Sequence, residues 1–242
     1  MNADLLDQFD TAQRMGFDLL AATAATLEAG MTEADLDDVA RSKAKAMGFE
    51  GWFHPPEIQF GTRSKSNAVW KVPSKTNRLS KGDLVVLDFG PALGEAYADA
   101  GTTLAFGVEE TPVVQVAREC ARATCGFSSH WKTVGELLVF AKAWANNNRL
   151  TLGSTRSIGH AILPKEGMLA FNFPRSAHAA TWLRRHQIRF LNPAKLEGMW
   201  AIRPLITDGA HGAAFEEMIF VSQDGCRIMG RDDLSQIGTL PS

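Results

Sequence analysis

Two aspartates stand close together in a stretch of the chain that reads as two neighbouring strands. In "DLVVLDFG", residues 83–90, side chains that alternate along a strand place Asp88 on the same face as Val86. The turn-like "PALGEA" that follows sends the chain back, so Asp99 can lie beside Asp88. Carboxylates that close repel each other unless one is protonated or a cation lies between them. The alternative is an exposed Asp99 in the turn and an Asp88 that accepts hydrogen bonds from backbone N–H groups.

Further groups that could bind a metal stand in two later apolar runs. His160 lies in "SIGHAIL", and Glu216 and Glu217 lie in "AAFEEMIFV". A lone histidine on an apolar strand is more often a core residue, and of two adjacent glutamates one usually faces solvent. Together with Asp88 and Asp99, however, they form a mixed oxygen and nitrogen set that suits Mn, Fe, Co or Zn. The pattern predicts a divalent metal site with one or two ions.

The elements that must position these residues occur in two similar series. Helical periodicity and capping residues predict two helices before the first group of strands, and two more before the second group. Strands that are grouped apart from helices indicate an α+β fold, with a site where the two halves meet. The expected elements are helices over 3–29 and 33–47, strands between 58 and 106, helices over 112–125 and 134–148, and strands near 157–163, 199–207 and 213–222.

Composition narrows the class of protein. The chain has 242 residues, of which 45% are hydrophobic and 21% are charged, as in an ordinary globular protein, and we expect one domain over residues 1–242. A net charge of -2 gives no reason to expect nucleic acid or an anionic membrane as a partner, and no apolar run is long enough to span a bilayer. Three cysteines without metal-ligand spacing and an acidic N-terminus favour the cytoplasm.

Five segments, in order, resemble the family of methionine aminopeptidases, Xaa-Pro aminopeptidases and creatinase. They are "LSKGDLVVLDFG", "YADAGTT", "IGHAI", "EGMWAIRP" and "FEEMIFVSQDG". The similarity covers nearly the whole chain and is typical of a short bacterial subgroup without the extra N-terminal domain of the Xaa-Pro enzymes. It implies the pita-bread fold, an α+β architecture with two pseudo-symmetric αβ halves around a curved antiparallel sheet.

The resemblance assigns metal ligands to four residues and departs from the family at the fifth. The four are Asp88, Asp99, His160 and Glu216. Where the family has the glutamate of its Glu-Pro pair, this chain has Arg203. A guanidinium cannot ligate a cation and repels one. The resemblance therefore implies one ion, an altered geometry, or no ion if Arg203 displaces the metal.

Two further departures affect the groups that would act on the substrate. The family's two histidines that orient the substrate carbonyl and stabilise the tetrahedral intermediate correspond here to Trp70 and Gly167. His54, His178 and His186 are candidates to replace them. The resemblance then implies His160, Glu216 and Arg203 as catalytic residues, and Arg203, His54 and Trp70 as substrate-binding residues.

Three functions fit these residues. The first is a metal-dependent hydrolase of a small peptide or amide, in which a metal-activated water attacks the carbonyl and Glu216 handles the proton. The second is a creatinase-like enzyme on a small amino-acid-like substrate, in which Arg203 clamps a carboxylate or pairs with Asp88 or Glu216, and His160 is the general acid or base. The third is a non-catalytic member of the family. A homodimer, common in the longer relatives, is left open.

Overall fold

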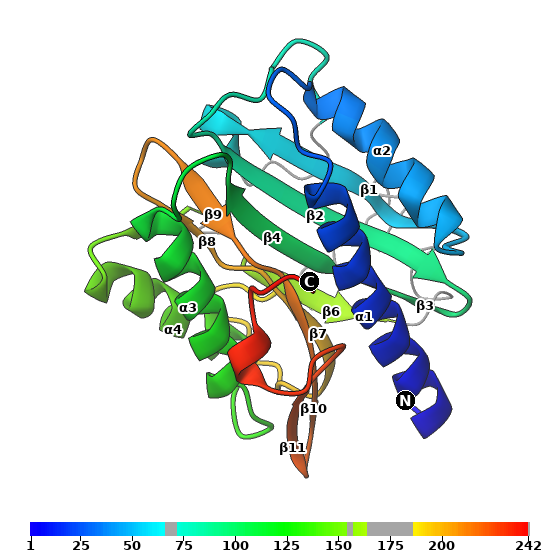
Figure 1. The fold of residues 1–242 in the computed structure, drawn as a ribbon. Coiled ribbons are helices and arrows are strands. Elements are labelled where there is room, and N and C mark those ends of the chain that lie inside the picture. The colour runs from blue at the N-terminus through cyan, green and yellow to red at the C-terminus, as the bar shows by residue number, and fades with distance from the viewer. Residues whose placement is uncertain (66–71, 154–156, 164–185, 242) are drawn as a thin grey trace, which may run out of the picture.

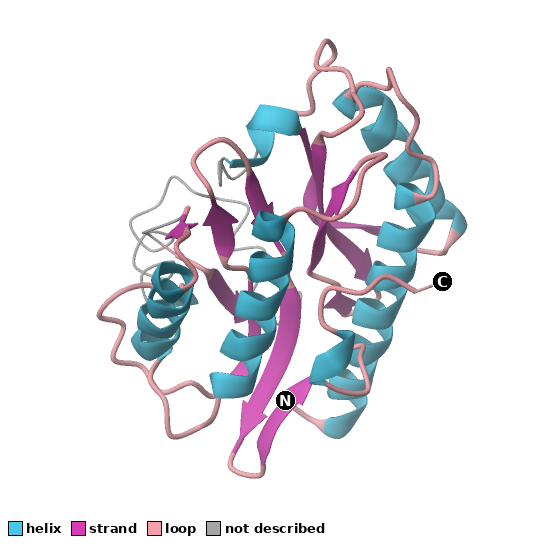
Figure 2. Ribbon diagram, turned by 60° about the vertical axis from the view of Figure 1, so that its left-hand side comes forward, coloured by secondary structure: helices cyan, strands magenta, loops and turns pink. Residues whose placement is uncertain are grey.

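The computed structural model describes residues 1–65, 72–153, 157–163 and 186–241 of the chain. Two groups of elements follow each other, each with two helices ahead of its strands (Figure 1). The strands occupy the middle of the molecule and the helices lie around them (Figure 2). The first group contains α1 (Ala3–Ala24), α2 (Glu33–Ala46), β1 (Gly51–Phe60), β2 (Leu84–Leu93), β3 (Ala96–Tyr97) and β4 (Ala100–Ala105).

The first two helices begin at polar caps. The side chain of Asn2 accepts a hydrogen bond from the N–H of Leu5, and Thr32 and Asp35 form a capping box. The second helix has the predicted bounds to within one residue, but α1 ends at Ala24 instead of reaching residue 29. Gly30, with a φ of 87°, lies in the turn that follows and donates its N–H to the carbonyl of Leu79.

The first sheet is antiparallel and is built around β2. Asp88 lies opposite Gly101 of β4 on one side and opposite Glu57 of β1 on the other. The strands begin at Gly51, earlier than the predicted residue 58, because "GWFHPP" pairs with β2 in spite of its two prolines. Residues 66–71, within the region where strands were expected, lie outside the described residues.

The second half confirms its two predicted helices. The N–H of Thr133 donates to the carboxylate of Glu136, the expected cap of α4. These elements are α3 (Pro112–Phe127), α4 (Val134–Asn147), β5 (Thr151–Leu152), β6 (Gly159–Ile162), β7 (Gly198–Ile202), β8 (Leu205–Thr207), β9 (Gly212–Ala214), β10 (Glu217–Ser222) and β11 (Gly225–Ile228).

Two predicted strands are interrupted where the chain passes from one sheet to another. The run 199–207 breaks at Arg203 and Pro204, and the run 213–222 breaks at Phe215 and Glu216. On one side of each break the chain belongs to the sheet β11-β10-β7-β6, and on the other to the sheet β5-β8-β9. The breaks place Arg203 and Glu216 at strand ends, where their side chains are freed from strict alternation.

The two halves are joined by backbone hydrogen bonds beside the expected site. The N–H of Glu216 donates to the carbonyl of Gly101 at 3.0 Å, and the N–H of Gly101 donates back to the carbonyl of Glu216 at 3.3 Å. A side chain at residue 101 would place its Cβ 2.9 Å from the Cβ of Glu216, so glycine is needed for this approach. Gly101 therefore pairs with Asp88 of its own half on one side and with Glu216 of the other half on the other side.

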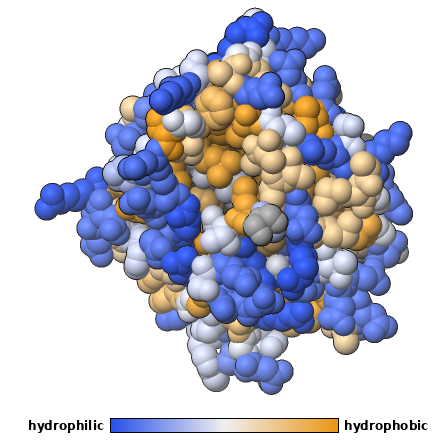
Figure 3. Space-filling model, in the orientation of Figure 1, coloured by the Kyte–Doolittle hydropathy of each residue, from blue (hydrophilic) through white to orange (hydrophobic). Residues whose placement is uncertain are grey.

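Each half has its own apolar core. Phe17, Leu36 and Phe89 are among the buried residues of the first, and Val114 and Phe215 are among those of the second. Hydrophilic side chains dominate the periphery of the face seen in Figure 3, and hydrophobic residues gather toward its upper middle. None of the helices in the described ranges has the length and apolar composition that crossing a membrane requires.

Candidate functional site

Five of the residues singled out in the sequence lie together where the two halves meet. Asp88 lies within β2, Asp99 between β3 and β4, His160 within β6, Arg203 just after β7, and Glu216 just before β10. The three carboxylate residues are almost fully buried, with exposed fractions of 5%, 1% and 4% for Asp88, Asp99 and Glu216. Buried carboxylates need positive partners, and the neighbours of each one show where that charge comes from.

Asp99 is held at its backbone by a residue of the first helix. Its N–H donates to Oε1 of Gln13 at 2.8 Å, and its carbonyl accepts from Nε2 of Gln13 at 3.0 Å. Gln13 is itself 0% exposed, so the amide has no water to bind instead. This clamp sets the direction of the Asp99 carboxylate. Sequence reasoning missed Gln13, although a glutamine among the apolar positions of α1 is the kind of signal that marks a buried polar contact.

His160 lies against one oxygen of that carboxylate. Its Nε2 is 3.1 Å from Oδ2 of Asp99, and its Nδ1 donates to the carbonyl of Ala161 at 3.0 Å. Burial alone would lower the pKa of His160, but the hydrogen bond with Asp99 and its charge raise the pKa above the ordinary value. The preceding Gly159 has a φ of 147°, and a Cβ there would lie 2.0 Å from the carbonyl oxygen of Ala201. Only glycine permits β6 to approach β7 at this point.

His54 lies against the other oxygen of Asp99. Its Nε2 is 3.2 Å from Oδ1 of Asp99 and 3.5 Å from Oδ1 of Asp88. Burial would lower the pKa of His54, but the hydrogen bond with Asp99 and the charge of Asp88 raise it to about 10. In Asp99, burial is opposed and outweighed by the hydrogen bonds from His160 and His54, which hold its pKa below the ordinary value. His54, expected only as a substrate-binding substitute, is thus part of the charged cluster.

Arg203 joins the two carboxylates from opposite halves. Its Nε lies 3.0 Å from Oδ2 of Asp88 and 3.4 Å from Oε2 of Glu216, and its side chain is 10% exposed. Burial opposes the positive charge, but the charges of Asp88 and Glu216 raise the pKa of Arg203. Burial, with the charges of Asp99 and Asp88, raises the pKa of Glu216 well above its ordinary value. The guanidinium of Arg203 thus occupies the position at which the resemblance led us to expect a metal-binding glutamate.

Glu217 takes no part in this cluster. Its carboxylate accepts hydrogen bonds from Nε and Nη2 of Arg231 at 2.7 and 2.9 Å, and Glu217 is 0% exposed. The expectation that one of the two adjacent glutamates faces solvent is wrong, because Arg231 neutralises Glu217 inside the core.

Of the other residues named in the sequence analysis, the structure describes only some. Trp70, Gly167 and His178 lie outside the described residues. His186 is half-buried and precedes Gln187, whose backbone forms a bridge with that of His160. The segment that begins at residue 186 therefore lies beside the site.

The donor atoms fit one metal ion better than two. Two groups have ligand atoms within 4.8 Å of one another, namely His54 with Asp88 and Asp99, and Asp99 with His160 and Glu216. When both histidines are neutral, as metal ligands must be, three ionised carboxylates and one guanidinium leave two negative charges, which one divalent ion neutralises. A second ion would compete with Arg203 for oxygens of Asp88 and Glu216. The residues present therefore fit a single-ion site.

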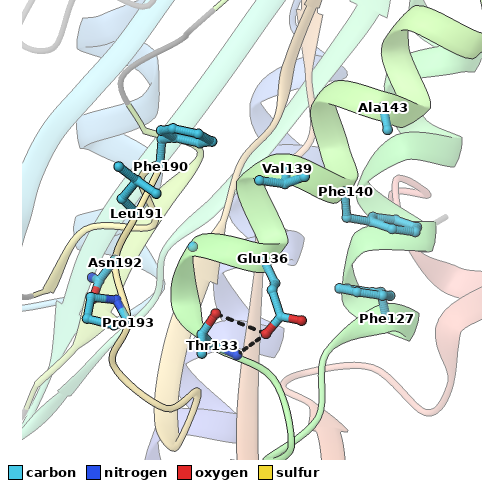
Figure 4. A pocket seen from close by; sticks show the side chains of 11 residues that line it. Phe127, Thr133, Glu136, Val139, Phe140, Ala143, Phe190, Leu191, Asn192 and Pro193 are labelled. Carbon is cyan, nitrogen blue, oxygen red and sulfur yellow. Dashed lines mark hydrogen bonds between the residues drawn. The ribbon is translucent and has the colours of Figure 1, made fainter.

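A separate apolar pocket of about 560 Å³ lies on α4. Aromatic rings of Phe127, Phe140 and Phe190 and the side chains of Val139 and Leu191 line it, beside the Thr133–Glu136 cap (Figure 4). None of the site residues described above lines this pocket.

The sequence matches a known family, and the fold resembles solved structures. The model of metallopeptidase family M24 matches residues 7–223. The fold resembles a prolidase from Pyrococcus furiosus, at 17% identity and a TM-score of 0.77 over 96% of this chain and 65% of that one. It also resembles an X-Pro aminopeptidase from Thermotoga maritima, at 20% identity and a TM-score of 0.76 over 96% of this chain and 62% of that one.

A shorter structure is covered almost completely. A methionine aminopeptidase from Thermotoga maritima has 16% identity and a TM-score of 0.75 over 96% of this chain and 98% of that one. The present chain thus spans somewhat under two thirds of the prolidase-type structures and nearly all of the methionine aminopeptidase. No curated protein matches the sequence. The expected pita-bread α+β fold is confirmed, and the chain belongs to metallopeptidase family M24.

Proposed function

We propose that this chain hydrolyses a short peptide or a small amide at the cluster around Asp99, with one divalent ion as cofactor. The supporting observation is that the ligand atoms of Asp99, His160 and Glu216, which come from both halves, lie within 4.8 Å of one another in a buried site. When bound, such an ion lowers the pKa of water and polarises a carbonyl oxygen. Mn, Fe, Co and Zn all suit this mixed donor set.

The side chains have separate roles in this proposal. Asp99, which belongs to both groups of donor atoms, holds the ion, and Gln13 keeps Asp99 oriented through its backbone. Glu216, whose pKa burial raises, accepts a proton from the attacking water and passes it to the leaving amine. Arg203 pairs with Asp88 and is the cationic side chain that would bind a substrate carboxylate.

The substrate class comes from the family and not from one relative. Structures with this fold include a prolidase, an X-Pro aminopeptidase and a methionine aminopeptidase, and all three are peptidases. We therefore propose a short peptide or amide without choosing the residue at the cleaved bond. Residence in the cytoplasm, supported by free cysteines at 120, 125 and 226, and assembly as a homodimer belong to the same proposal.

Arg203 favours a second candidate function. With both histidines of the cluster protonated, three positive charges face the three carboxylates, so the site is also balanced without an ion. His160 would then act as general acid or base on a small amino-acid-like substrate, as in a creatinase-like enzyme. The two candidates differ in whether turnover requires metal.

One experiment separates them. The purified protein, stripped with a chelator and then supplied with Mn²⁺, Fe²⁺, Co²⁺ or Zn²⁺, is assayed on Xaa-Pro and Met-Xaa peptides, simple amides and creatine-like compounds. We expect metal-dependent hydrolysis that falls about 10²–10⁴-fold in His160→Gln. Turnover that is unchanged by chelation supports the second candidate. No turnover with any substrate and metal overturns both.

A further inference from the structure

The two oxygens of Asp88 have different surroundings. Oδ2 accepts from Arg203 at 3.0 Å, whereas Oδ1 is buried and has no hydrogen-bond partner among the residues that the structure describes. A buried carboxylate oxygen without a partner is costly, so such an atom usually marks a bound group. The Nε2 of His54 lies 3.5 Å from this oxygen.

The imidazole of His54 is oriented so that its Nε2 faces the carboxylates of Asp88 and Asp99. Its Nδ1 lies 2.9 Å from the carbonyl of Pro55, and a carbonyl only accepts, so Nδ1 carries the hydrogen. In the neutral ring, Nε2 then presents a lone pair toward Oδ1 of Asp99 at 3.2 Å and Oδ1 of Asp88 at 3.5 Å. These three atoms can be held together by a proton on Nε2, which gives the hydrogen bond with Asp99, or by a metal ion that takes the place of that proton.

The pairing of β1 with β2 fixes the position of the His54 imidazole. His54 pairs with Gly90 across β1 and β2, and a Cβ at residue 90 would lie 2.5 Å from Cδ2 and 2.8 Å from Nε2 of His54. Gly90 has no left-handed φ, so no turn geometry requires a glycine there. The missing side chain makes room for the imidazole. The strand pairing of β1 is also irregular on both sides of His54, which re-aims its side chain.

We propose that His54, Oδ1 of Asp88 and Oδ1 of Asp99 form a ligand set for a divalent transition-metal ion, in which His54 replaces the ligand lost at Arg203. Arg203 pairs with Oδ2 of Asp88, which leaves Oδ1 as the oxygen that would bind the ion. One imidazole and two carboxylates suit Mn²⁺, Co²⁺ or Zn²⁺. This inference rests on the proposed function only in assuming that the cluster binds metal.

Cobalt binding tests the assignment without a substrate. Co²⁺ is titrated into the chelator-treated protein, and both the heat of binding and the visible absorption of bound Co²⁺ are recorded. Outer-shell changes at metal sites already cost about 10–100-fold in affinity, so His54→Gln should weaken binding by at least about 100-fold and change the spectrum. His130→Gln, which alters a histidine beside the ring of Trp131 between α3 and α4, is the control and should bind as the parent does.

A second pair of variants tests the position of the ring while all ligands are kept. Gly90→Ala displaces the imidazole of His54, and it should weaken Co²⁺ binding by about 10–100-fold. Gly51→Ala, in β1 with nothing within 4 Å of the new Cβ, is the matched control. Circular dichroism confirms that each variant is folded. If Gly90→Ala does not fold, the comparison of His54→Gln with His130→Gln decides alone.

The outcomes separate this inference from the proposed function. Loss of Co²⁺ affinity in His54→Gln upholds the inference even if no peptide is cleaved. Parent-like affinity and spectrum in His54→Gln overturn it, and so does a parent protein that binds no Co²⁺. Loss in His160→Gln but not in His54→Gln places the ion on the other side of Asp99 and also overturns it, while leaving the proposed function in place.

Discussion

Nε of Arg203 lies 3.0 Å from Oδ2 of Asp88, so a guanidinium pairs with a carboxylate inside the cluster. The same nitrogen lies 3.4 Å from Oε2 of Glu216. The resemblance leads us to expect a glutamate at residue 203, which would be a negatively charged acceptor. Arginine is a positively charged donor, so it reverses both properties where the two halves meet.

Removing the guanidinium should destabilise the metal-free protein. Arg203→Met leaves Asp88 and Glu216 buried without their cation, and breaking a buried pair in this way costs about 3–5 kcal/mol. Urea unfolding in the presence of a chelator measures the loss. Arg41→Met removes an exposed ion pair with Asp37 and should cost less than about 1 kcal/mol. Equal losses in the two variants would contradict a structural role for Arg203.

Restoring the acidic residue should raise the number of bound ions. Arg203→Glu replaces the cation by a fourth carboxylate, so the cluster gains two units of negative charge and a ligand. We expect the metal content to rise from one ion per chain to two, and the melting temperature to depend strongly on added metal. Elemental analysis after dialysis against Mn²⁺ or Co²⁺ gives the count. A content that stays at one would show that Arg203 does not limit it.

The backbone clamp on Asp99 should matter for stability. Gln13→Met keeps the length of the side chain but leaves the buried N–H and carbonyl of Asp99 without partners, which should cost about 2–4 kcal/mol. Gln8→Met, on the exposed side of the same helix, should be nearly neutral. Chemical unfolding of both variants tests this, and an equally small change in both would argue against the clamp.

One surface change should stabilise the protein. Arg149 follows the C-cap of α4 with a φ of 58°, a left-handed conformation that glycine adopts at lower cost. Arg149→Gly should therefore increase the free energy of unfolding by about 0.5–1 kcal/mol, which raises the melting temperature by roughly 1–3 °C. A lower melting temperature in calorimetry would contradict this reading of the helix end.

The thiol of Cys226 should react slowly near neutral pH. Cys226 is an exposed residue, but its sulfur lies 4.0 Å from the carbonyl oxygen of Cys125, and partial desolvation of the sulfur raises its pKa to about 11. The reactive thiolate is therefore roughly 100-fold scarcer below pH 9 than in an ordinary thiol. The rate with a disulfide reagent should rise about tenfold per pH unit up to about pH 11 and should approach the ordinary value after unfolding. A rate that levels off near pH 9 in the folded protein would contradict the shift.

The extent to which the sequence predicted the fold depended on how local each signal is. The caps of α2 and α4 are formed by residues three apart, so Thr32 and Thr133 identified both helices. The proximity of Asp88 and Asp99 follows from strand alternation and one turn, and the structure does bring them together around His54. The break at Glu216 follows from the curvature of two sheets, which a pattern along one strand does not contain.

The partners of the site residues were harder to foresee. Gln13 is separated from Asp99 by 86 positions, and its contact depends on how α1 is rotated against the sheet. His54 reaches the carboxylates only because Gly90 leaves room and because β1 is irregular there. The meeting of His160, Arg203 and Glu216 rested on the family resemblance, since no local pattern links residues on different strands of the second half.

The metal content of the purified protein tests the central claim most directly. Protein prepared without chelators, and the Asp99→Asn variant prepared in the same way, are measured by elemental analysis. Because both candidate ion positions include Asp99, we expect close to one divalent ion per chain in the parent and none in the variant. Two ions per chain in the parent, or the same metal content in Asp99→Asn, would contradict a single-ion centre built around Asp99 and limited by Arg203.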